Sequence, residues 1–184
     1  MEAGTRKSGQ ALRNEVRPRV RRALDAVELL KADHRRLRRM FHRFEHVAAE
    51  ERPKLVESIC QLLTLHMMVE EDLFYPAFLA ATGDKEFFQE ARVEHEGVRR
   101  LISQIEECGP HDESFAARVR VLAAMARHHM LEEEKRDGMF AEARNAEMDL
   151  GALGAQMKVR KTRLRKKLLL LRGPFGFTWA SVRP

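Results

Sequence analysis

The sequence has few of the residues that build disulfide-linked, membrane-spanning or β-rich proteins. Cysteine occurs only at Cys60 and Cys108, without a CxxC spacing, which excludes a disulfide framework and favours a reducing compartment. Proline occurs six times and tryptophan once, and the four leucines at 168–171 fall far short of a bilayer span. No apolar segment follows the basic amino end, so we expect a cytoplasmic protein without an export signal. The arginine-rich residues 1–22 leave a transit peptide as an alternative.

Charge is distributed unevenly along the 184 residues. The formal net charge is +6, yet residues 1–22 hold seven Lys/Arg against two Glu, and residues 151–184 hold nine Lys/Arg and no acid. The middle is therefore acidic, and the chain divides into a basic N-terminal tail at 1–22, a folded domain at 23–150 and a basic C-terminal extension at 151–184. Basic ends can contact an acidic partner, an anionic membrane or nucleic acid. We expect solvated tails instead, and nucleic acid ranks low because no aromatic residue interleaves with these charges before Phe175.

Hydrophobic periodicity predicts an all-α fold. Hydrophobic residues make up 44% of the chain and charged residues 34%, as in soluble helical proteins. Apolar positions three and four residues apart predict helices over 24–49, 54–80, 85–108 and 113–145, with Asp112 as the N-cap of the last. Short connections make neighbouring helices antiparallel, which predicts an up-down-up-down four-helix bundle. A further short helix is expected over 157–172.

Each predicted helix loses one apolar core position to histidine. These positions are His34, His66, His95 and His129, and two of them are followed four residues later by a glutamate, giving His66/Glu70 and His129/Glu133. At about 1.5 Å of rise per residue, all six side chains lie within roughly two helical turns of one level. Buried imidazoles and carboxylates are costly unless something satisfies them, and a metal ion satisfies several at once. The pattern therefore predicts a two-metal site between facing helices.

Each part of this pattern has a simpler interpretation. A single HxxxE on a helix is usually a surface ion pair, and a single core histidine is usually satisfied by a neighbour or water. The joint occurrence on four helices at one depth favours metal binding. The other polar residues near the pattern are expected to be solvated or to orient an imidazole, namely His42, His46, His111, His128, Glu71, Glu94, Glu96, Glu132 and Glu134.

Four segments of the sequence resemble the hemerythrin-like HHE cation-binding domains over about residues 26–157. They are Leu-Leu-Lys-Ala-Asp-His at 29–34, His-Met-Met-Val-Glu-Glu-Asp-Leu-Phe-Tyr-Pro at 66–76, Ala-Arg-Val-Glu-His-Glu at 91–96 and His-His-Met-Leu-Glu-Glu-Glu at 128–134. The resemblance implies a non-haem di-iron centre held by His34, His66, Glu70, His95, His129 and Glu133. It also implies oxygen or nitric oxide binding, iron handling, or redox sensing.

Two positions depart from the family pattern. Arg99 stands where oxygen-carrying hemerythrins have a further histidine, which implies an open coordination position or a weaker second metal. The stretch 135–141 reads as a two-residue insertion near the end of the fourth predicted helix.

The ligand types alone suit iron, zinc or manganese, and the resemblance favours two iron ions. An imidazole-rich set favours binding a small diatomic ligand or sensing redox state over turnover. The alternatives are a di-iron enzyme of the peroxidase or nitric oxide reductase type, and an iron-handling or interaction module with a structural metal site.

Overall fold

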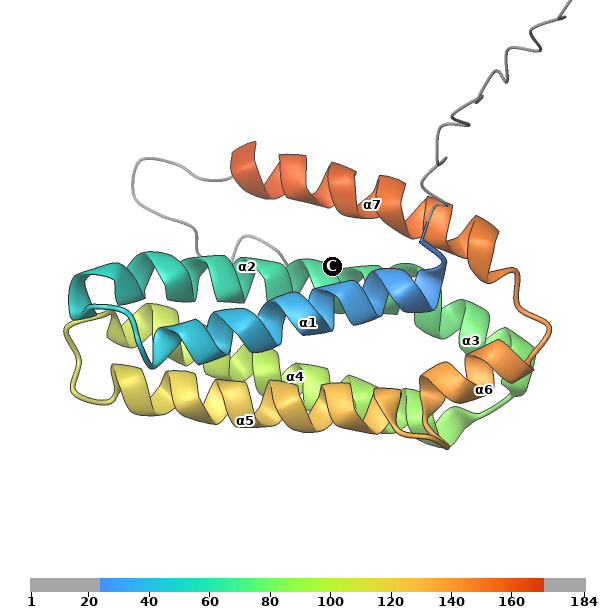
Figure 1. Cartoon of the computed structure of the whole chain (residues 1–184), viewed down its shortest axis with the longest axis horizontal. Coiled ribbons are helices and arrows are strands. Elements are labelled where there is room, and N and C mark those ends of the chain that lie inside the picture. Colours follow the sequence, from blue (N-terminus) through green and yellow to red (C-terminus); the bar gives the residue numbers. More distant parts are fainter. Residues whose placement is uncertain (1–23, 171–184) are drawn as a thin grey trace, which may run out of the picture.

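The computed structural model describes residues 24–170, with side chains as far as residue 168, and its elements are helical. They are α1 (Ala26–Phe44), the 3₁₀ turn η1 (Ala49–Glu51), α2 (Arg52–Val69), the π-helical segment η2 (Glu70–Phe74), α3 (Tyr75–Thr82), α4 (Lys85–Cys108), α5 (Phe115–Glu134), α6 (Met139–Asn145) and α7 (Leu150–Leu170). Helices α1, α2, α4 and α5 run side by side as a bundle, and α7 lies over α1 and α2 (Figure 1). This arrangement confirms the predicted all-α bundle with an added C-terminal helix.

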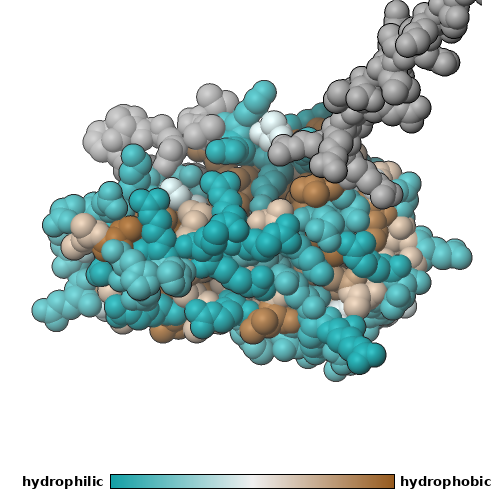
Figure 2. Space-filling model, viewed as in Figure 1, coloured by the Kyte–Doolittle hydropathy of each residue, from teal (hydrophilic) through white to brown (hydrophobic). Residues whose placement is uncertain are grey.

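The predicted apolar seams form the core. Leu30, Ile59, Ile102 and Leu122, one from each bundle helix, have no exposed surface. The face shown in Figure 2 is mostly hydrophilic, with apolar residues scattered among polar ones. Within residues 24–170, no helix combines the length and apolarity that crossing a membrane requires. The predicted tail at 1–22 and the last residues of the predicted helix 157–172 lie outside the described part.

Local capping explains where several helices begin and end. The Asp25 carboxylate accepts a hydrogen bond from the Glu28 amide at 2.8 Å, and Asp84 does the same at the start of α4. Gly83, at φ 72°, ends α3 in the left-handed conformation that glycine adopts without strain. The prediction of α4 over 85–108 is confirmed. The first predicted helix is shorter than expected, since α1 ends at Phe44 and a turn follows it.

The predicted helix 113–145 is wrong as a single element, because α5 ends at Glu134 and α6 begins at Met139. Lys135 adopts an extended backbone, and the chain turns at Gly138, whose N–H donates to the Lys135 carbonyl at 3.0 Å. A Cβ at Gly138 would lie 2.3 Å from the Glu132 carbonyl oxygen. The turn is therefore folded tightly on the end of α5. At its other end, α5 begins at Phe115 and its N-cap is Ser114, not Asp112, which instead accepts from the Ser114 amide at 2.7 Å.

The C-terminal helix begins earlier than predicted, at Leu150 instead of residue 157. Asp149 caps it by accepting from the Ala152 amide at 2.9 Å. Met157, Leu164 and Leu168 are buried against α1 and α2. The helix therefore carries an apolar stripe that packs on the bundle and a basic outer surface.

Candidate metal centre

The six residues that the sequence singled out converge in the core of the bundle. His34 comes from α1, His66 from α2, His95 from α4 and His129 from α5, while Glu70 opens η2 and Glu133 lies near the end of α5. All six are buried, with exposed fractions between 0% and 5%. Four of them, His34, His66, Glu70 and Glu133, offer ligand atoms that all lie within 4.8 Å of one another, and Glu70, His95 and His129 do the same.

The four imidazoles form two pairs that face each other through Nε2. The His34 and His66 Nε2 atoms are 3.0 Å apart, and those of His95 and His129 are 3.1 Å apart. Two ligands that each lie about 2.1 Å from one ion are roughly 3.0 to 3.4 Å apart at octahedral or tetrahedral angles. Each pair is therefore spaced as two ligands of a single ion.

The two carboxylates join the imidazole pairs. Glu70 Oε1 lies 3.2 Å from His66 Nε2, and its Oε2 lies 3.5 Å from His95 Nε2. Glu133 Oε2 lies 3.4 Å from His34 Nε2 and 3.6 Å from His129 Nε2. Each glutamate thus stands between one histidine of each pair, where it could bridge two ions.

A second layer of carboxylates orients the imidazoles from outside. The Nδ1 atoms of His34, His95 and His129 lie 2.6, 2.9 and 2.7 Å from carboxylate oxygens of, respectively, Glu134, Glu71 and Glu94. An Nδ1–H that donates to a carboxylate leaves the Nε2 lone pair pointing into the cluster. In the His95–His129 pair, where both Nδ1 atoms face a carboxylate, this tautomer places two Nε2 lone pairs 3.1 Å apart, an arrangement that a cation between them relieves.

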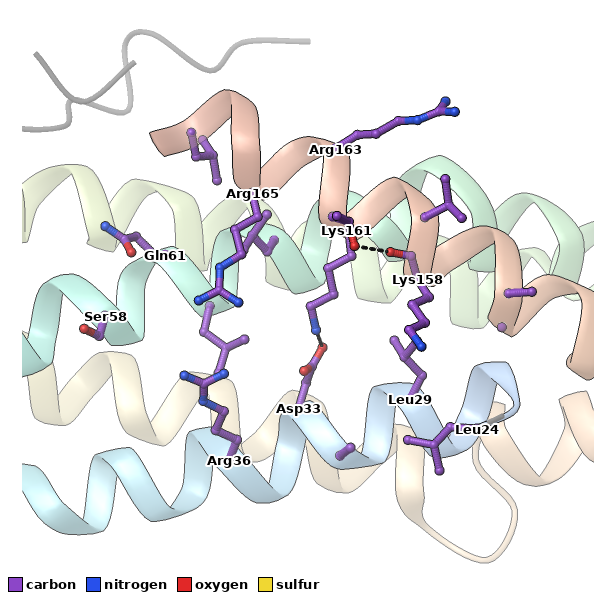
Figure 3. A pocket seen from close by; sticks show the side chains of 18 residues that line it. Leu24, Leu29, Asp33, Arg36, Ser58, Gln61, Lys158, Lys161, Arg163 and Arg165 are labelled. Atoms are coloured by element: carbon purple, nitrogen blue, oxygen red, sulfur yellow. Dashed lines mark hydrogen bonds and ion pairs between the residues drawn. The ribbon is translucent and has the colours of Figure 1, made fainter. Parts of the chain in front are cut away.

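The fourth histidine has a looser partner that connects it to α7. His66 Nδ1 is 3.6 Å from Asp33 Oδ2, beyond hydrogen-bond reach, and Asp33 binds Lys161 of α7 (Figure 3). A second contact from the same helix joins Arg160 to Asp72 of η2 at 2.8 Å. Two ion pairs therefore join α7 to the bundle near the cluster, one to α1 at Asp33 and one to η2 at Asp72.

Arginines lie outside two of the three outer glutamates, Glu134 and Glu71. Arg38 donates to Glu134 at 2.9 Å, and Arg99 donates to Glu71 at 2.8 Å. Arg99, at the position of the family's further histidine, therefore supports an outer carboxylate and contributes no ligand. Of the other predicted edge residues, Glu96 pairs with Arg100 and Glu132 with Lys135.

Burial and neighbours give the two core carboxyls opposite pKa shifts. Burial raises the pKa of Glu70 well above its usual value, and the neighbouring carboxylates Glu133 and Asp33 raise it further. Burial also acts to raise the pKa of Glu133, but His129 and His34 outweigh it and lower that pKa to about 2. Burial lowers the pKa of His66 and of His95 to about 4. Without a cation, this site disfavours ionising both carboxyls, whereas a divalent ion favours ionising both.

Sequence reasoning missed one residue of the cluster, Tyr75. Its buried hydroxyl donates to Glu133 Oε1 at 3.3 Å and lies 3.3 Å from His95 Nε2. A regular helix would place residue 74 on the face of His66 and Glu70. The η2 segment is instead π-helical, because the amide of Tyr75, which follows it, donates to the Glu70 carbonyl five residues earlier. The wider turn brings Tyr75 inward. The sequence signal that could have identified Tyr75 as a site residue is its phenol hydroxyl, next to an apolar stripe.

The arrangement also leaves buried oxygens that no described residue satisfies. Both carboxylate oxygens of Glu70 and Oε2 of Glu133 are buried without a hydrogen-bond partner. Unsatisfied buried carboxylates are rare unless they bind an ion. The donor set therefore fits one or two cations.

Comparison with known proteins agrees with this geometry. The family model of the hemerythrin HHE cation-binding domain matches residues 25–141, more than half of the chain. The chain belongs to the hemerythrin HHE cation-binding domain family.

Two relatives place this HHE domain chain among known proteins. A crystal structure of a hemerythrin HHE cation-binding domain-containing protein homolog from Mycobacterium kansasii is similar with a TM-score of 0.70 and 27% identity, over 82% of this chain and 94% of that one. A DNA nickase of Nostoc sp. is 25% identical over 150 residues, covering 79% of this chain and 41% of the nickase. The chain thus spans less than half the length of that relative.

Proposed function

We propose that this HHE domain binds two non-haem iron ions and uses them to bind oxygen or nitric oxide reversibly, or to sense redox state. The observation that carries the proposal is the pairing of four imidazoles with two glutamates that stand between the pairs. His34 and His66 would hold one ion, and His95 and His129 the other. Glu70 and Glu133 would bridge them. Zinc and manganese suit the same donor atoms, and iron is favoured by the family.

The chain's own residues orient the candidate ligands and shield the cluster. When bound, iron would supply a redox-active centre and a coordination position for a diatomic ligand. The outer carboxylates hold three of the imidazoles in fixed orientations, and Phe140, stacked on His34 with ring centroids 5.6 Å apart, covers that side of the cluster. Tyr75 remains a neutral hydrogen-bond donor, because burial raises its pKa well above the usual value and Glu70 and Glu133 raise it further.

Visible spectroscopy of the iron-loaded protein tests this proposal. The reduced protein should gain an absorption band on exposure to oxygen or nitric oxide, and removal of the gas should reverse the change. Steady consumption of reductant with peroxide or nitric oxide would instead support an enzyme of the peroxidase or nitric oxide reductase type. Bound metal without any gas-dependent spectrum would leave a structural or iron-handling site.

A basic groove between α7 and α1 favours a second candidate, contact with an acidic partner. Lys158 and Arg165 on α7 and Arg36 on α1 line a groove of about 1060 Å³ between the helices (Figure 3). Among the described residues, none of these three side chains has an ion pair or hydrogen bond. The Nostoc relative is a DNA nickase, so a nucleic acid is the partner to test first, although the absence of aromatic residues among these charges ranked it low.

Salt dependence separates phosphate contacts from other association. The association constant for duplex DNA should fall as salt rises. Replacing these three cations together by glutamine should make the slope of log K against log salt less steep by about 2 to 3. Replacing Arg92, Arg100 and Arg127, exposed on α4 and α5, serves as the matched control. An equal change in both triple variants, or no binding by the wild-type chain, would remove this candidate.

A further inference from the structure

A cavity of about 580 Å³ opens beside the predicted metal centre. It lies between α4, α5 and the first residue of α6, Met139. Of the six candidate ligands, only His129 and Glu133 line it. The cavity therefore borders the cluster on the side of His129 and Glu133, next to the break between α5 and α6.

Burial of the ligands points to the same side. His129 is 5% exposed and Glu133 is 3% exposed, whereas the other four candidate ligands are at 0% or 1%. The Glu133 Oε2 atom is buried and has no hydrogen-bond partner among the described residues. The cavity thus leads to a carboxylate with an oxygen free to accept a cation.

The lining of this cavity is acidic. Four glutamates contribute to it, and no lysine or arginine does; the glutamates are Glu90, Glu94, Glu132 and Glu133. Lys135 is not among the lining residues, but its ammonium pairs with one of them, Glu132, at 2.7 Å. Carboxylate oxygens lining a concave surface concentrate divalent cations, and they can replace part of a hydration shell.

We propose that this acidic cavity is the route by which a divalent cation reaches the buried cluster. Glu90 and Glu132 attract the hydrated ion at the mouth, and Glu133 and His129 are the first candidate ligands that it meets. The inference rests on the proposed metal binding, and it concerns the rate of uptake rather than the final coordination.

Stopped-flow uptake of Co²⁺ by the metal-free full-length chain, followed by visible absorption, tests the route. At low ionic strength the double variant Glu90→Gln/Glu132→Gln should take up Co²⁺ about tenfold more slowly, and Lys135→Gln should take it up about threefold faster. The number of ions bound at saturation should stay at the wild-type value in both. At about 1 M salt, where the Debye length is about 3 Å, these differences should largely vanish.

The double variant Glu96→Gln/Glu107→Gln is the matched control, because it removes the same charge from exposed positions of α4 outside the cavity. Wild-type uptake is expected for it. Equal slowing in both double variants would show an effect of net charge and overturn the route, as would an unchanged rate in Glu90→Gln/Glu132→Gln. A wild-type chain that binds no Co²⁺, Fe²⁺ or Zn²⁺ would instead overturn the proposed function itself.

Discussion

At the scale of single residues, the cluster depends on a few side chains that each serve two neighbours. Glu70 and Glu133 each stand between the imidazole pairs, and Tyr75 contacts His95 and Glu133. Loss of a shared group should therefore affect both ion positions.

Glu70→Gln tests the shared role directly. The amide keeps the shape of the side chain but removes its negative charge, so the variant should bind fewer than two ions per chain, with an affinity lower by about tenfold or more. Metal content after dialysis, measured by elemental analysis, checks this result. Glu96→Gln, which alters an exposed carboxylate of α4, is the control, and equal metal content in both variants would contradict the shared role.

Metal affinity should also depend on pH. Burial opposes protonation of His34 and His129, but the neighbouring carboxylates outweigh it and raise both pKa values, and the pKa of Glu70 is raised by burial. The folded metal-free chain therefore holds protons that an ion must displace. Affinity should rise as the pH rises and fall as the pH falls through these raised pKa values. Binding titrations at pH 6, 7 and 8, together with proton release to an indicator dye, measure it. Affinity independent of pH would disagree with these shifts.

At the scale of elements, the sequence predicted the helices and six site residues but missed local departures from the regular helix. The stripes predicted which face of each bundle helix is buried, because burial follows a 3.6-residue period. That period cannot reveal the π-helical turn at η2, which brings Tyr75 inward, or the tight turn at Gly138, which depends on contacts with carbonyls of α5. The role of the outer carboxylates also depends on neighbours more than 20 residues away.

The start of α7 illustrates a related limit. The helix expected over 157–172 begins at Leu150, so Gly151 and Gly154 are both helical, and Gly154 lies against the backbone at the start of α1. A Cβ at Gly154 would lie 2.7 Å from the Ala26 backbone nitrogen, whereas one at Gly151 would meet only the Asp149 side chain at 3.4 Å. Close packing therefore requires glycine at Gly154 but not at Gly151.

This difference gives a matched pair of substitutions in one helix. Gly154→Ala should destabilise the chain by about 1–3 kcal/mol, because the backbones of α7 and α1 must separate. Gly151→Ala should be neutral or stabilising by up to about 1 kcal/mol, because alanine has the higher helix propensity. Urea unfolding of the metal-free chain measures both, and equal effects would show that α7 does not pack closely on α1.

At the scale of the whole molecule, the bundle brings polar groups from four helices into one core. A cation that satisfies them should bind the folded chain far better than the unfolded one. At a free metal concentration about a thousandfold above Kd, this linkage stabilises the fold by about 4 kcal/mol.

Metal removal tests this linkage on the unmodified chain. Thermal unfolding should shift to a lower Tm after chelation and return to its first value when metal is restored. The shift should grow with free metal concentration, as mass action requires. A Tm that is the same with and without metal would mean that the buried glutamates and imidazoles are satisfied without an ion.

We propose above that imidazoles from α1, α2, α4 and α5, with two glutamates between them, hold two ions at one buried point. Anomalous diffraction from crystals of the metal-loaded protein tests it most directly. Two anomalous peaks are predicted, one beside His34 and His66 and one beside His95 and His129, separated by about 3.5–4 Å. Peaks only at surface residues, or none within the bundle, would show that these six residues do not form a metal site.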